Sequence, residues 1–408
     1  MMAPAVRRLV DQAYREIADR DAAYFEHFPI ALPADADDGA AEAMRYLARA
    51  YCIDVRRGAA ADPVSRCMLD AIADAHLAAA GALELALEPR QGLRACDLAA
   101  HGYEERTTRH GRRFYVRDAA GPSVLLVSAL GIPLAIWSRF ILDAGHGLRL
   151  ILPEMRCGEL LEGGMRTPDG LGEHVADLLE VIAADGAAPA FVAGWCNGGR
   201  IAIRLARELA DAVDGLVLLS VTLRGADTPA APPSAFEENL ARIFLAVSAN
   251  PGLAAGFVKI LKRSSAAVDW SALGDDPEKR AAMLFAMPAK DFAALLQVPM
   301  SRPEYLVNYA RRTSLDEAFP VMQDLKALGA RVLVITGTHD HVVSNAQVLA
   351  ALNECPSEVL HASIGGAGHY VQDLQYPYFR WLLEHFVRRD EPRAVPRRVR
   401  IERHKALS

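Results

Sequence analysis

The chain has 408 residues and a formal net charge of −6 at pH 7, with 52% apolar and 24% charged residues. This composition is typical of a globular protein with one large domain plus an accessory region. The negative charge argues against nucleic acid as a partner, and no apolar run approaches the roughly 18 residues of a membrane span. The chain starts without an apolar signal core, and its six cysteines are scattered. We therefore expect a cytoplasmic protein with reduced thiols.

Residues 1–111 are rich in alanine and predict an N-terminal helical region. Beyond them the hydrophobic period changes, and short apolar runs alternate with helical patterns. Such runs are typical of strands that are buried on both faces of a mostly parallel sheet, which makes the chain an α/β protein. The strands are predicted at residues 113–116, 123–130, 148–153, 190–193, 215–221, 331–337 and 358–363.

The strand pattern lapses over residues 222–330, where helical stretches are broken by prolines. This segment predicts a helical cap inserted between two parts of the sheet domain, residues 112–221 and 331–388. Residues 389–408 are rich in arginine and predict a basic tail that is solvated and partly disordered, with a docking role as the alternative. Several apolar residues of the cap could select the substrate or form ordinary core: Phe244, Leu245, Phe257, Trp270, Phe285 and Phe292.

The most informative motif is Gly194-Trp195-Cys196-Asn197-Gly198-Gly199, which follows a predicted strand and precedes a helical pattern. Its glycines permit the strand and the helix to approach closely, so the turn can hold Cys196 in a strained backbone conformation. The thiol would then lie at the N-terminus of a helix, where the helix dipole favours the thiolate. The alternative is a buried structural cysteine in a glycine-rich turn.

Two further polar residues follow predicted strands. Asp340 comes after the strand at 331–337, and His369 lies in a glycine-rich loop after the strand at 358–363. His339 and His341 flank Asp340 and could bind zinc as a pair. No third ligand with a recognisable spacing accompanies them, so we predict neither a metal nor a cofactor, and the two histidines are otherwise ordinary loop residues.

The motif around Cys196, with Asp340 and His369 behind it, resembles the α/β-hydrolase superfamily over residues 112–388. In that superfamily a G-x-S-x-G turn carries the nucleophile, and the acid and the histidine follow in that order. The resemblance implies a triad of Cys196 as nucleophile, His369 as base and Asp340 as the acid that orients it. It also implies an oxyanion hole made by the backbone N–H groups of Asn197 and Leu130, with Ala129 or Gly131 as alternatives to Leu130. An ordinary turn after the strand at 123–130 remains the other interpretation.

Cysteine in place of serine narrows the resemblance to two families. One is the poly(hydroxyalkanoate) synthases, which carry G-x-C-x-G with a following Asp and His. The other is the cysteine-nucleophile aminoacyltransferases that shuttle an amino acid between carrier domains of nonribosomal peptide assembly lines. Dienelactone hydrolase is similar over residues 194–199 but lacks a cap. The resemblance implies acyl-thioester donors and acceptors as partners, among them phosphopantetheinyl carrier proteins and coenzyme A.

Thiol chemistry favours transfer of an acyl group over its hydrolysis. A thiolate that attacks a thioester makes another thioester, so the exchange is nearly isoenergetic and reversible. A cap that excludes water would let the acyl-enzyme wait for an acceptor. We therefore predict an acyltransferase that forms an acyl-Cys196 intermediate and passes the group to a thiol or hydroxyl. The alternatives are a thioesterase or ester hydrolase with the same triad, a poly(hydroxyalkanoate) synthase-like polymerase, and a non-catalytic binding protein.

Overall fold

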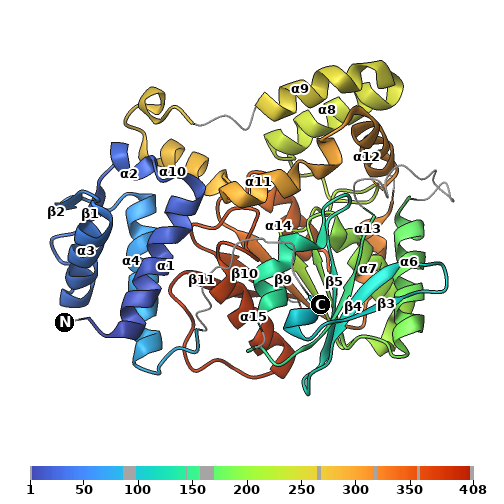
Figure 1. Ribbon diagram of the computed structural model, residues 1–408, viewed down its shortest axis with the longest axis horizontal. Helices are drawn as coiled ribbons and strands as arrows, with labels where there is room; N and C mark the ends of the chain where they lie inside the picture. The colour runs from blue at the N-terminus through green and yellow to red at the C-terminus, as the bar shows by residue number, and fades with distance from the viewer. Residues whose placement is uncertain are drawn as a thin grey trace.

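The computed structural model describes residues 2–85, 98–143, 145–156, 170–263, 268–316, 319–355 and 359–404. Its central element is a nine-stranded sheet with the strand order β11-β10-β9-β8-β7-β5-β6-β4-β3 (Figure 1). The strands are β3 (Glu104–Thr107), β4 (Arg113–Arg117), β5 (Ser123–Val127), β6 (Arg149–Pro153), β7 (Phe191–Trp195), β8 (Gly215–Leu219), β9 (Arg331–Gly337), β10 (Val359–Ile364) and β11 (Val399–His404).

The six strands from β6 to β10 in this order are parallel, whereas β3, β4 and β11 join the two edges in antiparallel fashion. All seven predicted strands are present, so the prediction of an α/β fold is confirmed. Strand β3 was not predicted because its sequence, Glu-Glu-Arg-Thr, is polar throughout. Since β3 pairs with β4, the sheet domain begins before the predicted boundary at residue 112.

Helices cover both faces of the sheet and explain why the parallel strands are largely apolar. Along β5, Val124 and Leu126 belong to the core on one face, and Leu125 and Val127 belong to the core on the other. The first face is covered by α5 (Ser138–Leu142) and α15 (Tyr376–Arg388), and the second by α6 (Gly170–Asp185), α7 (Gly198–Leu209), α13 (Val321–Lys326) and α14 (Asn345–Asn353).

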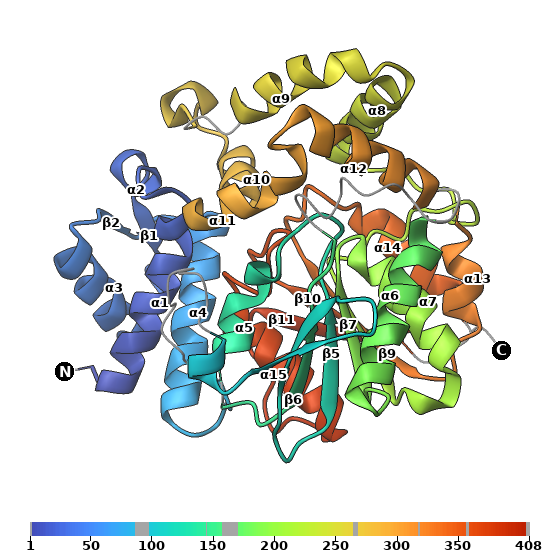
Figure 2. The ribbon, with the colours of Figure 1, turned by 45° about the vertical axis from the view of Figure 1, so that its right-hand side comes forward.

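Ahead of α13, the described chain between β8 and β9 forms the α-helices α8 (Ala235–Ala249), α9 (Ala254–Arg263), α10 (Pro277–Ala286), α11 (Lys290–Leu296) and α12 (Pro303–Asp316). Figures 1 and 2 show α8, α9 and α12 stacked beyond one end of the sheet. These three helices pack through a small apolar cluster that includes Phe244, Val247 and Leu306. Helix α13 instead contributes Val321 to the sheet core, so the cap helices end before the predicted boundary at residue 330.

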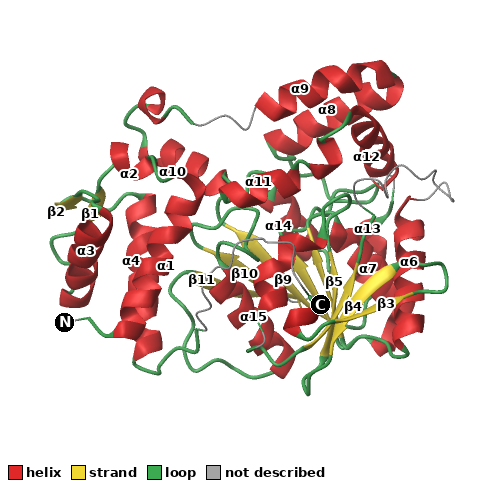
Figure 3. Cartoon of the chain, viewed as in Figure 1, coloured by secondary structure: helices red, strands yellow, loops and turns green. Residues whose placement is uncertain are grey.

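The N-terminal region consists of α1 (Pro4–Asp21), α2 (Tyr24–His27), α3 (Asp38–Tyr51) and α4 (Pro63–Ala79), with a two-stranded parallel sheet of β1 (Ile30–Leu32) and β2 (Val55–Arg57) (Figure 3). Its apolar core includes Trp270 and Phe285 of the cap segment. The indole N–H of Trp270 donates to Asp21 Oδ2 at 3.0 Å. The cap is therefore packed against the N-terminal helices. Among the described residues, no helix is long and apolar enough to cross a membrane.

The prediction of a solvated, partly disordered tail is wrong for residues 389–404. Strand β11 pairs with β10 along its whole length, and Arg398 just before it is only 4% exposed. The Arg398 guanidinium binds both carboxylate oxygens of Glu16, at 2.7 and 2.9 Å, and also donates to the Gly365 carbonyl. The charged sequence concealed this strand because an edge strand can carry charged side chains while its backbone completes the ladder. Residues 405–408 lie outside the described residues.

The ion pair between Glu16 and Arg398 yields a prediction for stability. Arg398→Met removes one partner and leaves a buried carboxylate, a change that typically costs 3–5 kcal/mol. Because Arg20 still lies 3.6 Å from Glu16, we expect a loss of about 3 kcal/mol, the lower end of that range. Urea unfolding at neutral pH measures it, with Arg400→Met as the control because the Arg400 side chain is 79% exposed. Equal losses in the two variants would contradict the prediction.

Candidate active site

Cys196 occupies a sharp turn between β7 and α7. Its φ angle is 55°, in the left-handed region that residues other than glycine rarely adopt. Three glycines make this turn possible. A Cβ atom at Gly194 would lie 2.7 Å from Gly199 Cα, one at Gly198 would lie 2.5 Å from the Ser128 carbonyl oxygen, and one at Gly199 would meet a methyl group of Val221 at 2.4 Å. The glycines thus serve the close approach of strand and helix that the sequence predicted.

The predicted acid and base lie next to each other at the same edge of the sheet as Cys196. Asp340 follows β9 and His369 follows β10, and both side chains are at most 2% exposed. The Nδ1 atom of His369 lies 2.9 Å from Asp340 Oδ2 and 3.2 Å from Oδ1. The backbone N–H groups of Val342 and Val343 each donate to Asp340 Oδ1 at 2.9 Å. The carboxylate is therefore fixed in position and accepts from the imidazole.

The charges of this group favour a protonated imidazole. Burial alone would lower the pKa of His369, but the negative charges of Asp340 and Cys196, with hydrogen bonds to both, raise that pKa to about 10. For Asp340, burial would raise the pKa of the carboxyl, but the His369 charge and the hydrogen bonds to it lower that pKa on balance. The structure thus brings Cys196, His369 and Asp340 together, and their interactions favour a protonated His369 imidazole.

The two residues of the predicted oxyanion hole also lie together, with an unexpected contact between them. The backbone N–H of Leu130 donates to the side-chain Oδ1 of Asn197 at 2.8 Å. The N–H of Gly131 donates to the Arg156 carbonyl at 3.2 Å, so this alternative donor is engaged elsewhere. In this structure the Leu130 N–H is therefore already hydrogen-bonded to the Asn197 amide oxygen. A substrate oxygen can use that donor only if the Asn197 side chain moves.

A cavity of about 70 Å³ adjoins Cys196. The cap supplies much of its wall through Phe236, Glu237, Leu240, Ala241 and Phe244 of α8 and Tyr309 and Thr313 of α12. The remaining lining residues come from the sheet domain and the loop after β8: Cys196, Asn197, Arg200, Thr222, Arg224, Val342 and Val343. Phe244 is thus the one predicted specificity residue that lines this cavity.

Glu237 connects the cap to the loop that carries Asp340. Its carboxylate accepts from the Ser234 N–H at 2.9 Å and from the Ser344 N–H at 3.2 Å. Ser234 in turn caps α8 and donates its hydroxyl to the Val342 carbonyl at 2.8 Å. This link was not predicted from the sequence. The pattern Ser-x-x-Glu ahead of an apolar helical run is a capping box and could have indicated it.

The other predicted specificity residues, histidines and cysteines do not line the cavity beside Cys196. Trp270 and Phe285 pack with the N-terminal helices, Phe292 lies in the sheet core, and Leu245 is 71% exposed. Among the described residues, the side chains grouped closely enough to hold a metal ion are His361, Glu402 and His404, and neither His339 nor His341 belongs to this group. Cys52, Cys67, Cys196 and Cys355 are free thiols, whereas Cys96 and Cys157 lie outside the described residues.

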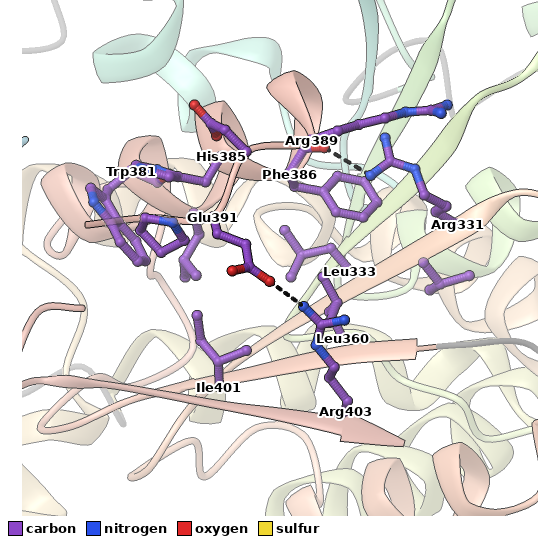
Figure 4. Close-up of a pocket in the computed structure, with 14 residues that line it drawn as sticks. Arg331, Leu333, Leu360, Trp381, His385, Phe386, Arg389, Glu391, Ile401 and Arg403 are labelled. Atoms are coloured by element: carbon purple, nitrogen blue, oxygen red, sulfur yellow. Dashed lines mark hydrogen bonds and ion pairs between the residues drawn. The ribbon is translucent and has the colours of Figure 1, made fainter. Parts of the chain in front are cut away.

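A second cavity, of about 380 Å³, lies at the opposite ends of the parallel strands. Figure 4 shows Arg331 and Leu333 from the start of β9 and Leu360 from the start of β10 around it, together with the end of α15 and strand β11. Asp340 and His369 follow the other ends of β9 and β10. This cavity is therefore separate from the group around Cys196.

Comparison with known proteins agrees with this fold. A family model described as alpha/beta hydrolase fold matches residues 95–376, which is more than half of the chain. The chain belongs to the α/β-hydrolase family. No curated protein matches its sequence significantly.

Among solved structures, DBJA (mutant dbja delta) matches with a TM-score of 0.52 and 18% identity, and the epoxide hydrolase CorEH matches with a TM-score of 0.51 and 16% identity. Each match covers 70% of this chain and 98% of the other. An esterase from Thermogutta terrifontis reaches 20% identity with a TM-score of 0.48, over the same shares of the two chains. At these identities the first two matches establish the fold alone.

The raised pKa of His369 predicts a dependence of stability on pH. In the unfolded chain the pKa of a histidine is about 6.5, and in the folded chain that of His369 is about 10. Protonated His369 therefore stabilises the fold fully below pH 6.5, and this contribution is lost as the pH rises through 10. We expect the free energy of unfolding to fall more steeply from pH 7 to above pH 10 in the wild type than in His369→Gln, as measured by urea unfolding. Parallel curves would contradict the assignment.

Proposed function

We propose that the protein is an acyltransferase that carries its acyl group as a thioester on Cys196. The observation that supports it most is a cysteine in the strained turn between β7 and α7, in contact with a buried His369–Asp340 pair. Membership of the α/β-hydrolase family supports the coarser statement that this is a hydrolase-type site. We favour acyl transfer over hydrolysis because a thiolate that attacks a thioester forms another thioester in a nearly isoenergetic exchange.

The proposed reaction has two balanced halves. The Cys196 thiolate adds to the carbonyl carbon of a donor thioester. The tetrahedral intermediate then collapses, the bond to the donor sulfur breaks, and His369 gives its proton to the leaving thiol. An acceptor thiol next transfers its proton to His369 and attacks the acyl carbon, and Cys196 leaves again as thiolate. Because one thioester replaces another in each half, neither half has a large driving force in either direction.

The oxyanion of each tetrahedral intermediate needs donors. We propose that the backbone N–H groups of Leu130 and Asn197 supply them once the carbonyl oxygen of the substrate displaces Asn197 Oδ1 from the Leu130 N–H. The exchange of one oxygen acceptor for another leaves the number of hydrogen bonds to Leu130 unchanged. The Asn197 side chain then keeps this buried donor satisfied between turnovers.

The cavity supports a short acyl group. Pockets for drug-sized ligands are typically about 300–1,000 Å³, whereas the space beside Cys196 is about 70 Å³. A small acyl or aminoacyl group fits better than a long fatty chain unless the cap moves. Helices α8 and α12 lie over this space and would restrict water around the thioester. A phosphopantetheine arm of a carrier protein, or coenzyme A, is the donor and acceptor that we propose.

Hydrolysis by the same residues is the second candidate, and it is favoured by the family to which the chain belongs. Water would then replace the acceptor thiol in the second half-reaction. The ratio of free acid to acylated acceptor at a fixed acceptor concentration separates the two candidates. A wild-type protein that produces only free acid, whatever carrier or thiol is offered, would be a thioesterase.

Loading of Cys196 is directly testable by intact mass. The wild type is incubated with a panel of acyl-carrier proteins and acyl-coenzyme A thioesters, and we expect an adduct that Cys196→Ala abolishes. Cys52→Ala is the matched control, because Cys52 is an exposed free thiol with nearly the same φ angle, 56°. Cys196→Ser should load but transfer poorly, since return from an ester to a thioester is uphill. An adduct that persists in Cys196→Ala would refute the assignment.

The role of Asp340 is tested separately. Asp340→Asn preserves the shape of the side chain but favours the wrong tautomer of His369, and the same change in a serine triad costs about 10⁴ in rate. We expect a loss of about 10²–10⁴ in the rate of acyl transfer, because a cysteine thiolate depends less on the acid than serine does. Circular dichroism checks the fold. Turnover at the wild-type rate in both Asp340→Asn and His369→Ala would exclude the triad.

A further inference from the structure

Three potential metal ligands lie on one face of the sheet, on the edge strand β11 and its neighbour β10. In the antiparallel ladder of β10 and β11, His361 is paired with Glu402 and Val359 with His404. Paired residues project to the same face, and so do residues two apart along a strand. His361, Glu402 and His404 therefore share a face. Figure 4 shows the other face of these strands, where Leu360, Ile401 and Arg403 lie around the second cavity.

The spacing of the three side chains suits a small cation. One ligand atom from each residue lies within 4.8 Å of the other two, and His404 Nε2 is 3.9 Å from Glu402 Oε2. Zinc bonds of about 2.1 Å in a tetrahedral arrangement place neighbouring ligand atoms about 3.4 Å apart. Small rotations of the side chains would close the difference. The other oxygen of Glu402 accepts from Arg400 at 2.7 Å, which leaves Oε2 toward the histidine.

The hydrogen bonds of His404 point independently to a ligand. Its Nδ1 atom lies 3.2 Å from Asn353 Oδ1, and an amide oxygen can only accept, so Nδ1 carries the proton. In the neutral ring, Nε2 then presents a lone pair. That atom is buried and has no hydrogen-bond partner among the described residues. A buried lone pair directed toward a carboxylate oxygen is the arrangement that a cation would satisfy.

His361 is likewise suited to ligation. Its ring is 6% exposed, and Nε2 lies 2.9 Å from Thr336 Oγ1. Metal-binding histidines almost always have their second ring nitrogen hydrogen-bonded to a group that orients the ring. Thr336 and Asn353 provide such partners for His361 and His404.

We propose that His361, Glu402 and His404 bind a divalent transition-metal ion, and that the ion fastens β11 to the sheet. Two imidazoles and one carboxylate form a ligand set that suits zinc, with water in the fourth position. The site is structural, because strands β8 and β9 separate β10 from β7 and Cys196. It is independent of the acyl transfer proposed above.

The test titrates the chelator-treated full-length chain with zinc chloride and measures binding by calorimetry. It uses a Cys196→Ala background, because the Cys196 side chain is another group that could bind zinc. We expect one equivalent to bind, with an affinity that His404→Gln and Glu402→Gln each reduce at least about 10-fold. His110→Gln is the matched control, since His110 and Glu180 form an exposed pair to which the described part of the chain adds no third ligand. Affinity should be unchanged in this control.

If His404→Gln unfolds the chain, Glu402→Gln still tests the site, because the Glu402 side chain is partly exposed and its replacement should leave the fold intact. Hydrogen exchange gives a second readout. Zinc should slow exchange of the β11 amides in the parent and not in Glu402→Gln. No zinc binding, or binding that survives both His404→Gln and Glu402→Gln, would overturn the proposal. Binding at these residues without protection of β11 would overturn the fastening role.

Discussion

The close approach of strand β7 to helix α7 is the constraint on which the rest of the candidate site depends. Gly194 and Gly199 pack so closely that a single added Cβ atom would lie 2.7 Å from the opposite backbone. Only this approach permits a turn sharp enough to hold Cys196 at a φ of 55°. Left-handed backbone costs an L-residue about 1–2 kcal/mol, so the surrounding packing must maintain it. As a result, the Cys196 thiol lies at the same edge of the sheet as Asp340, which follows β9, and His369, which follows β10.

The loop that carries His369 is held by parts of the chain far from it in sequence. A Cβ atom at Gly366 would lie 2.3 Å from Cys67 Sγ of α4, and one at Gly368 would lie 2.1 Å from the Phe285 carbonyl oxygen of the cap. The Arg398 guanidinium also donates to the Gly365 carbonyl. The glycine-rich sequence thus reflects crowding, because three regions press on the loop at once. The N-terminal helices and the cap serve as supports of the histidine as well as walls.

Sequence patterns predicted the structural features that depend on neighbouring residues. They did not predict the features that depend on pairing between distant segments. The apolar runs of the parallel strands and the glycines around Cys196 are visible because burial and steric crowding act on those residues themselves. Asp340 and His369 were found through their positions after strands, and the structure brings them together, while their catalytic roles remain predictions. Strand β11 escaped notice because its charged side chains mask a backbone that completes the ladder. The contact between Leu130 and Asn197, and the group of His361 with Glu402, depend on side-chain rotation and strand register, which no local pattern encodes.

The salt bridge between Glu16 and Arg398 joins residues that lie 382 positions apart in the chain. During synthesis on a ribosome, which adds about 5–20 residues per second, the carboxylate of Glu16 emerges long before its partner exists. For tens of seconds or more, the first helix has an acidic side chain that it cannot bury without cost. We therefore expect the N-terminal helices to remain loosely docked until Arg398 and the last strand, β11, have been synthesised. Completion of the histidine loop then becomes one of the final events of folding, so Cys196, His369 and Asp340 come together only when the whole chain is in place.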